Sequence, residues 1–284
     1  MNEYIDLKKF RKVATDAYPA NHLYCLVDHA GMPGLHSQLM RARVPWSNLF
    51  AGSQEQAALQ VAPLLFLIDD ECMKEHSRLL SWVAQHGTYT SCMLLLSSPL
   101  SLNELGHRLA RRVHFRISEQ TDVLLRFFDP RVFEALASEL APPQRKAFLG
   151  VADCWWYINR SGDLRQQLAG YDPDDAFNTP MLLSAQQEFA LVEASEVDQV
   201  AAQVQATVPD VYIRMGAPQR VSFLRRQMAA ANAAGVSGTH DVALYCGLAL
   251  LYGEDFALEP SWQETFTKVH GGARLSDAVA EEDA

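Results

Sequence analysis

The chain lacks the motifs that mark the common nucleotide-binding and hydrolytic folds. It has no GxxxxGKS or GxxxxGKT loop, and no GxGxxG string follows its first apolar run. Its nearest approach to a GxSxG turn, at Gly235–Gly238, has the wrong spacing and lies between two expected helices. These absences exclude a Walker-type nucleotide site and a Rossmann dinucleotide site, and they argue against a GxSxG serine hydrolase.

Cysteines are few, and long apolar runs are absent. The five cysteines are Cys25, Cys72, Cys92, Cys154 and Cys246. No two form a CxxC pair, and most lie in apolar surroundings, so we expect buried thiols in a reducing compartment. No run approaches the ~18 apolar residues that span a membrane, and the N-terminal segment has no apolar stretch typical of a signal peptide. We therefore expect a cytoplasmic protein that does not insert into membranes.

Basic residues are scarce relative to acidic ones. The sequence has 24 Lys or Arg and 34 Asp or Glu, which is a formal net charge of −10. A phosphate backbone repels such a chain on average, so nucleic acid is not expected as a partner. Four acids and no base fall within residues 276–284, and we predict a disordered acidic tail over residues 271–284. With 49% hydrophobic residues, the rest of the chain has enough apolar area to fold into globular domains.

The first half of the chain alternates short apolar runs with amphipathic segments. The runs at 23–28, 62–69 and 89–97 are nearly continuous in hydrophobicity, which predicts strands buried on both faces of a sheet. The amphipathic stretch at 71–86 predicts a helix that ends at Gly87, and thus a βαβ unit. The sequence therefore favours an N-terminal lobe of the α/β (α+β) class, with a mixed, mostly parallel sheet flanked by helices.

Capping and turn patterns predict further elements of this lobe. Ser101, with Glu104 three residues later, predicts a capping box at the start of a helix. The segments 114–118 and 122–128 predict an antiparallel hairpin that joins the same sheet. A last strand is expected at 153–159, before a polar stretch rich in Gly, Asp and Pro.

After Pro180 the composition changes to long Ala, Gln, Glu, Val and Leu segments that are typical of helices. Helices are predicted at 184–208, 219–234, 241–252 and 260–269. We therefore expect a smaller, all-helical C-terminal lobe. The predicted division is an α/β domain over 1–160, a linker over 161–180, a helical domain over 181–270 and the acidic tail over 271–284.

Two clusters of polar residues resemble metal or acid–base sites. Asp28 and His29 follow the first strand, with His36 seven residues on, and they can ligate a metal or act as a base. The alternative is a capping aspartate with two loop histidines. Cys72 and His76 lie one helical turn apart, but the acids around them also fit the start of a helix, where they oppose the positive end of its dipole.

Three consecutive aromatic residues lie in the last predicted strand. Strand geometry places Trp155 and Tyr157 on one face and Trp156 on the other. If one face is exposed, these rings are candidate contacts for a protein partner, because aromatic side chains are enriched at interfaces. The alternative is a place in the core of the sheet.

The segment 125–132, LRFFDPRV, resembles a motif of the effector chaperones, or adaptors, of bacterial type VI secretion. The resemblance involves Arg126, Asp129, Pro130 and Arg131. The order of the neighbouring segments LYCLVDHA, WSNLFAG and APLLFLID is also similar to that family. In the second half, the GTHD string and the later Glu-Pro-x-Trp element resemble the helical region that often accompanies the domain.

The resemblance implies a cytoplasmic protein that binds a toxic effector before export and helps to load it onto the spike protein of the secretion machine. It implies no enzymatic activity, no catalytic residues and no cofactor. An enzyme of a hydrolase-like or metal-dependent kind, using Asp28, His29 and His36, is the alternative that the residues leave open.

The physical role of the motif has two interpretations. Asp129 is placed to cap a helix, Pro130 to occupy its first turn, and Arg126 or Arg131 to pair with a carboxylate. These roles would stabilise the fold. In the second interpretation the same side chains contact the partner directly.

Overall fold

The computed structural model divides the chain into two compact units. Unit 1 is Met1–Leu191 and unit 2 is Val192–Ala284. The residues that the structure describes are 5–68, 74–88, 90–118 and 120–282. Among the helices in these ranges, none combines the length and the apolar character needed to cross a bilayer.

Unit 1 is built on a six-stranded sheet in the spatial order β2-β3-β1-β4-β7-β8. Every neighbouring pair in this sheet is antiparallel. Its strands are β1 (His22–Asp28), β2 (Trp46–Asn48), β3 (Pro63–Leu67), β4 (Met93–Ser98), β7 (Cys154–Ile158) and β8 (Leu164–Leu168). A smaller sheet has the order β6-β5-β9, formed by β5 (His114–Arg116), β6 (Asp122–Leu124) and β9 (Met181–Leu182).

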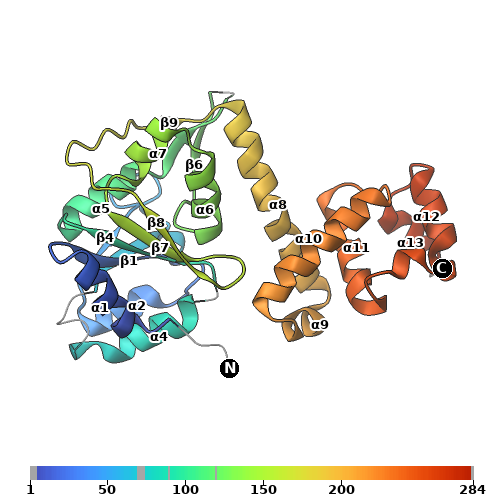
Figure 1. Cartoon of the computed structure of the whole chain (residues 1–284), viewed down its shortest axis with the longest axis horizontal. Coiled ribbons are helices and arrows are strands. Elements are labelled where there is room, and N and C mark those ends of the chain that lie inside the picture. Colours follow the sequence, from blue (N-terminus) through green and yellow to red (C-terminus); the bar gives the residue numbers. More distant parts are fainter. Residues whose placement is uncertain (1–4, 69–73, 89, 119, 283–284) are drawn as a thin grey trace. The chain divides into compact units, whose positions relative to one another are not determined.

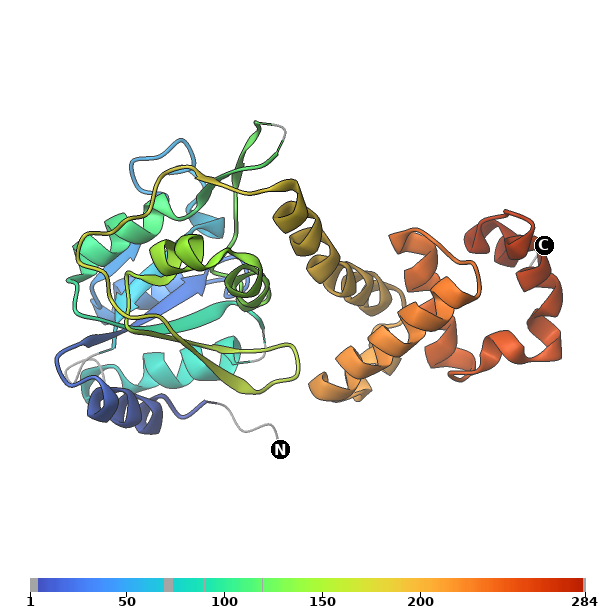
Figure 2. The same ribbon diagram turned by 45° about the horizontal axis from the view of Figure 1, so that its top comes forward.

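Helices cover both faces of the larger sheet. One face is covered by α1, α2 and α4, and the other by α5, α6 and α7 (Figure 1). The turned view separates these layers, with α1 and α4 below the strands and α6 and α7 above them (Figure 2). The helices are α1 (Leu7–Ala17), α2 (Leu35–Ala42), α4 (Ser77–Gly87), α5 (Leu102–Arg111), α6 (Pro130–Glu139) and α7 (Pro142–Leu149), with a 3-10 turn η1 (Leu59–Val61).

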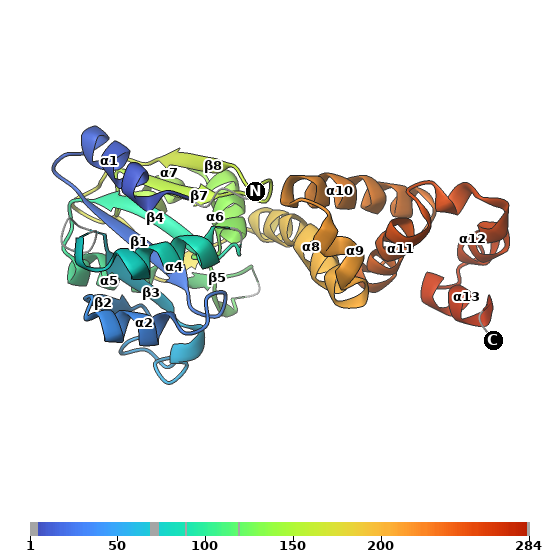
Figure 3. The ribbon, with the colours of Figure 1, turned by 90° about the horizontal axis from the view of Figure 1, so that it is seen from below.

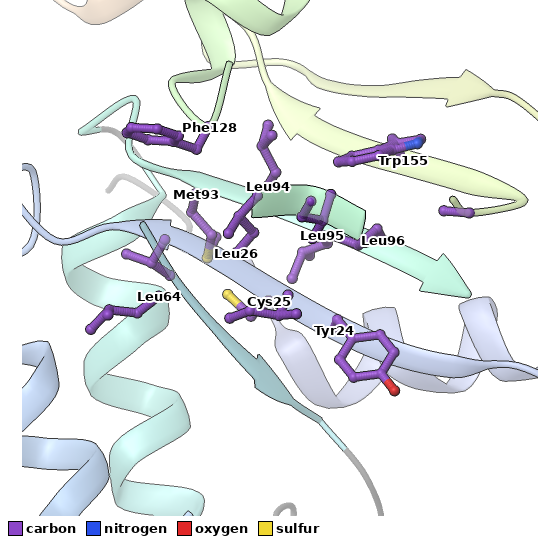
Figure 4. Packing of buried hydrophobic residues seen from close by; sticks show 14 of the residues in the cluster. Tyr24, Cys25, Leu26, Leu64, Met93, Leu94, Leu95, Leu96, Phe128 and Trp155 are labelled. Atoms are coloured by element: carbon purple, nitrogen blue, oxygen red, sulfur yellow. The ribbon is translucent and has the colours of Figure 1, made fainter. Parts of the chain in front are cut away.

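The core of unit 1 surrounds strands β1 and β4, whose side chains are almost all buried (Figure 4). Successive residues of a strand point to opposite faces, so Tyr24 and Leu26 face one helix layer and Cys25 faces the other. The hydroxyl of Tyr24 donates to the carbonyl of Leu100, just before α5, at 2.6 Å. The apolar runs are therefore continuous because both faces of each strand are covered, as their hydrophobicity predicts.

The α+β class is confirmed, but the prediction of a mostly parallel sheet is wrong. Strands β3 and β4 run in the same direction, as expected of a βαβ unit, because both are antiparallel to β1. They are not neighbours, since β1 lies between them. A local pattern of strand, helix and strand predicts the direction of the second strand but not whether another strand is inserted between the two.

The predicted hairpin forms, but it does not join the main sheet. Phe115 of β5 pairs with Val123 of β6 in antiparallel register, and with Met181 of β9 in parallel register. Phe115 is fully buried. The hairpin therefore completes a separate small sheet with a strand that lies more than fifty residues later in the chain, which local turn patterns do not reveal.

The predicted linker at 161–180 is part of the folded unit 1. Strand β8 within it forms the outer strand of the main sheet, and Asp175 is held by Arg112 at the end of α5. Arg112 is fully buried and also donates to the carbonyls of Phe148 (2.7 Å) and Ala147 (2.8 Å). Polar composition predicted a linker because most side chains of the outer strand β8 are exposed, and because the ion pair of Asp175 with a buried arginine leaves no mark in the local sequence.

Unit 2 consists of helices and short 3-10 turns around its own core (Figure 3). Helix α8 begins in unit 1 and continues into unit 2, so the units divide within this helix and not within the predicted linker. Helices α10 and α11 pack against each other. The elements are α8 (Ala185–Thr207), α9 (Pro209–Arg214), α10 (Ala217–Ala233), α11 (Thr239–Tyr252), η2 (Phe256–Leu258), η3 (Pro260–Trp262), α12 (Gln263–His270) and α13 (Leu275–Glu282).

The acidic C-terminal segment is helical where a disordered tail was predicted. Helix α13 packs against α12 and α11, and Leu275 and Ala278 are each only 1% exposed. Asp277, Glu281 and Glu282 lie on the same short helix as these apolar residues, and the high proportion of acids is what led composition to predict a tail. The core of unit 2 includes the apolar face of this helix.

Candidate functional site

Asp28 and the RFFDPR segment, about a hundred residues apart in the chain, meet at the end of strand β1. The side chain of Asp28 is 3% exposed, and its Oδ2 accepts a hydrogen bond from Nη2 of Arg126. Its Oδ1 accepts from the backbone N–H of Ala30 at 3.1 Å. Asp28 of the first predicted cluster is therefore in contact with the RFFDPR motif, and we call the charged residues Asp28, Arg126, Asp129 and Arg131 the β1 site.

Asp129 has both of the structural roles that the sequence predicted for the motif. Its Oδ1 accepts from the backbone N–H of Arg131 at 2.9 Å, which caps α6, and Pro130 occupies the first turn. The guanidinium of Arg131 also grips the carboxylate at two points, with Nε to Oδ1 at 3.0 Å and Nη2 to Oδ2 at 2.6 Å. Asp129 is 5% exposed, so both of its oxygens are engaged inside the fold.

The two phenylalanines of the motif anchor it in the core. Phe127 and Phe128 are buried, and the ring of Phe127 lies edge-on to Phe148 of α7, with centroids 5.4 Å apart. Figure 4 shows Phe128 among the buried side chains around strand β4. The guanidinium carbon of Arg126 lies 6.0 Å from the centroid of the Phe128 ring. Because the rings are fixed, the flanking charged groups are held at the surface end of β1.

Cys92 lies next to the β1 site, although the sequence predicted only that it is buried. The N–H of Asp28 donates to the carbonyl of Cys92 at 2.8 Å. Burial raises the pKa of the Cys92 thiol to about 11, and the charges of Asp28 and Asp129 also raise it, while a hydrogen bond to Thr90 acts in the opposite direction. The thiol is therefore protonated at neutral pH and is not poised as a nucleophile.

The two histidines beside Asp28 are engaged in contacts within the fold. Nδ1 of His29 lies 2.8 Å from the carbonyl oxygen of Leu59, and since a carbonyl can only accept, Nδ1 carries the proton. The ring of His36 packs edge-on against Trp46, with centroids 5.0 Å apart. The rings of His29 and His36 are 6.5 Å apart. The structure thus brings the three predicted residues into one region, but their polar atoms do not converge on a shared point.

The metal hypothesis finds no support in the part of the chain that the structure describes. No group of three or more His, Cys, Asp or Glu side chains there is arranged to hold a metal ion. Of the second predicted pair, His76 precedes α4 without a side-chain capping bond, and Cys72 lies outside the described residues. The other four cysteines are buried, as predicted.

The three aromatic residues of β7 divide between the faces of the sheet as strand geometry predicts. The rings of Trp155 and Tyr157 contact Phe133 of α6, with centroids 5.1 and 5.4 Å apart. Trp156 faces the other layer and packs edge-on against Phe10 of α1 at 5.1 Å. Trp155 is fully buried and Trp156 is 7% exposed. Helices cover both faces, so the two tryptophans lie in the core rather than on a surface.

The β1 site combines two buried carboxylates with two arginines that reach the surface. Both oxygens of Asp28 and both of Asp129 already accept hydrogen bonds, so contacts within the fold hold both carboxylates in place. The Arg126 side chain remains 58% exposed and the Arg131 side chain 34%. The arrangement places two arginine side chains at the surface, each paired with a buried carboxylate.

Comparison with known protein families supplies a match. Residues 23–147 match a family model described as "Domain of unknown function (DUF4123)". The matched region runs from β1 into α7 and includes all four residues of the β1 site. No curated protein and no solved structure matches the chain.

Proposed function

Residues 23–147 belong to the DUF4123 family, which is associated with effector adaptors of type VI secretion, and from this premise we propose that the chain is a non-catalytic adaptor. It binds a toxic effector in the cytoplasm and helps to load it onto the spike protein of the secretion machine. Its partners are thus two proteins, and it needs no nucleic acid, no membrane insertion and no cofactor.

The observation that carries this proposal is the family match over the region that contains the β1 site. The match bears out the resemblance that the LRFFDPRV segment predicted. The geometry of the site is compatible with a binding role, because the fold holds both carboxylates in place and the Arg126 side chain remains 58% exposed. The neighbouring thiol of Cys92 is held protonated by burial.

Within the motif, we assign different roles to its charged residues. Asp129, Pro130 and Arg131 stabilise the start of α6, as the capping bond and the two-point ion pair indicate. Arg126 is more than half exposed and lies beside the buried carboxylate of Asp28. It is therefore the residue of the motif that is best placed to touch the effector, and Asp28 sets its position.

The first test is capture of the tagged full-length chain from its native cytoplasm, followed by reconstitution with each purified protein that it retains. We expect a toxin and a spike protein among the specific partners, and a stable complex with the toxin in size-exclusion chromatography. The toxin should also resist limited proteolysis better in the complex. A toxin that elutes and is digested identically with and without the chain would contradict the proposal.

A second test separates contact from folding within the β1 site. Arg126→Ala should weaken binding of the captured effector by about tenfold or more, as expected for the loss of a well-placed interface arginine. Arg126→Lys keeps the charge but not the planar fork and should give an intermediate loss. Asp129→Ala is the matched control, because it should lower the unfolding midpoint while leaving the affinity of the folded protein unchanged.

A further inference from the structure

The negative charge of the chain is concentrated in unit 2. Residues 192–284 contain six Lys or Arg and thirteen Asp or Glu, a formal charge of −7. Residues 1–191 contain eighteen Lys or Arg and twenty-one Asp or Glu, a formal charge of −3, although this unit is about twice as long. A positively charged partner is therefore drawn to unit 2 more strongly than to unit 1.

The same unit exposes large apolar side chains in one short segment. At the end of α11 and in the turns that follow, Leu251 is 54% exposed, Tyr252 58% and Leu258 80%. We call residues 251–262 the apolar turn segment. Single exposed leucines are ordinary on a protein surface, but three large apolar side chains within eight consecutive residues of an ordered turn are typical of a contact surface.

The apolar turn segment is held in place by a chain of aromatic contacts. Phe256 is 1% exposed, and the ring of Trp262 lies edge-on to it, with centroids 5.0 Å apart. The ring of Tyr252 in turn contacts Trp262 at 5.5 Å. The backbone N–H groups of Glu259 and Trp262 donate to the carbonyls of Phe256 and Glu259, each at 3.0 Å. A surface that is already ordered loses little conformational entropy when a partner binds.

Acidic side chains alternate with these apolar ones. Glu254, Asp255 and Glu259 all belong to the segment and are all exposed. Glu254 is paired with Arg226 of α10, with Nη2 to Oε1 at 2.8 Å. Neither Asp255 nor Glu259 has a Lys or Arg within ion-pair distance among the described residues. The segment therefore presents apolar anchors with acidic groups beside them, the usual pairing of an interface core with a charged rim.

We propose that the apolar turn segment is a docking site for a positively charged, amphipathic segment of a partner protein. Tyr252 and Leu258 receive the apolar side chains of that segment, and Asp255 and Glu259 receive its Lys or Arg side chains. The proposal rests on the adaptor role proposed above and adds to it the chemistry of one partner. An anionic membrane is disfavoured as the occupant, because it would be repelled by these carboxylates.

The test uses the full-length chain and a defined probe. The probe is a fluorescent peptide of about 18 residues made of Leu and Lys, with Leu three and four positions apart so that one face of a helix is apolar and the other is positively charged. One control peptide replaces every Lys by Glu, and the other replaces every Leu by Ser. We expect the Leu–Lys peptide to bind at least about tenfold more tightly than either control, because binding needs both charge and apolar contact. Equal binding of the Leu–Lys and Ser–Lys peptides would overturn the proposal.

Two pairs of variants locate the binding. The double variant Asp255→Lys, Glu259→Lys should weaken binding of the Leu–Lys peptide. Its control is the double variant Asp16→Lys, Asp174→Lys, which makes the same change in net charge on unit 1 and should weaken binding far less. Tyr252→Ser with Leu258→Ser should also abolish most of the binding. Its control is the substitution of two equally exposed apolar residues of unit 1, Val13→Ser with Leu168→Ser.

The circular dichroism spectrum and the unfolding midpoint of each variant show whether it is folded. Equal losses for the variants of the apolar turn segment and for their controls would overturn the proposal. If the captured effector and spike protein both bind the Asp255→Lys, Glu259→Lys variant as tightly as the wild type, this docking site is wrong while the adaptor role stands. If no effector is captured but the peptide results hold, the adaptor role fails and the docking surface stands.

Discussion

Unit 1 and unit 2 treat their buried polar groups differently. In unit 1 the fully buried Arg112 donates to three carbonyls and to the carboxylate of Asp175. In unit 2, Oε1 of Gln227 and Oδ1 of Asp241 are buried without a hydrogen-bond donor, and no such atom occurs in the described part of unit 1. In the described residues, unit 1 therefore satisfies its buried polar side chains more completely than unit 2 does.

The two units also differ in how far their contacts reach along the chain. In unit 1, Nδ2 of Asn21 donates to Oδ2 of Asp153 at 2.7 Å, across more than a hundred residues. In unit 2, neighbouring helices in the sequence pack together, as α10 with α11 and α12 with α13 do. We therefore expect that a substitution in the core of unit 1 disturbs segments that are distant in the sequence. A substitution in unit 2 should mainly disturb neighbouring helices.

The largest effect on stability is expected for Arg112→Met in unit 1. The substitution leaves the carbonyls of Phe148 and Ala147 without this donor and removes the buried one of the two arginines that bind Asp175, so the free energy of unfolding should fall by about 3–5 kcal/mol. Arg226→Met in unit 2 is the matched control. Arg226 pairs with Glu254 at the surface, so this substitution should lower the free energy of unfolding far less. Similar losses for both variants in urea unfolding would contradict the contrast between the units.

A cavity in the core of unit 2 should destabilise that unit alone. Phe256→Ala removes a ring that contacts Tyr245, Trp262 and Phe266, at a cost of about 3–5 kcal/mol. Hydrogen exchange should show faster exchange of amides in α11 and α12 but unchanged protection of β1 and β4. Phe133→Ala should give the reverse pattern. Uniform loss of protection across the chain would show that the units unfold together.

Removing the cap of α6 should have a moderate effect. Asp129→Ala deletes the capping acceptor and is expected to lower the free energy of unfolding by about 1 kcal/mol, with some further loss from the freed Arg131. Asp129→Asn keeps a good capping group and loses only the charge, so it should be closer to the wild type. Chemical denaturation of the two variants measures their free energies of unfolding, and Asp129→Ala should be the less stable. Equal losses of stability would mean that the ion pair with Arg131 contributes more than the capping hydrogen bond.

Alkaline pH should weaken both units through their buried thiols. Burial raises the pKa of Cys92 to about 11 and that of Cys246 to about 12, against an ordinary value of 9.0. The unfolded chain therefore releases these protons first, so stability is complete below pH 9 and falls as pH rises toward 11–12. At pH 10 the loss is roughly 1 kcal/mol for each thiol.

The thiol contribution is measured by urea unfolding at pH 8 and pH 10. Cys246→Ala should show a smaller fall in stability between the two pH values than the wild type does, and Cys92→Ala should show the same behaviour in unit 1. An identical fall in the wild type and both variants would assign the alkaline loss to other groups, such as Tyr24, whose pKa is raised by burial to about 12.

The smallest effect is expected for Gln227→Leu in unit 2. The substitution removes the hydrogen bond from Nε2 to Glu254, but it also removes a buried acceptor that has no donor. The two changes offset each other, so the free energy of unfolding should shift by less than about 1 kcal/mol in either direction. A loss as large as that of Arg112→Met would show that the polar contacts of unit 2 are as specific as those of unit 1.

Local features of unit 1 were predictable because they depend on neighbours in the chain. The capping box of Ser101 and Glu104 forms, with the N–H of Ser101 donating to Oε2 of Glu104 at 3.2 Å. Asp129 caps α6 as predicted, and α4 ends at Gly87. Strand β8 was missed because its side chains are mostly exposed and polar, so no apolar pattern marks it.

The β1 site could be predicted only in pieces. Asp28 and the motif around Arg126 were each identified from the sequence, but nothing in either segment indicates that they meet. Their contact depends on where β1 lies in the sheet and on how Phe127 and Phe128 pack. Cys92 carried no signal beyond its apolar neighbours.

The sequence by itself determined the α+β class, most helix and strand positions, the helix caps, the buried thiols and the similarity of residues 23–147 to a family model. These follow from local periodicity, capping chemistry and the order of short motifs. Only the tertiary structure decided the antiparallel order of the sheet, the burial of Arg112 against the predicted linker, the meeting of Asp28 with Arg126, and the packing of the acidic C-terminal helix. Each of these depends on which distant segments become neighbours, and the free energy of that choice is shared among many side chains rather than encoded in any one of them.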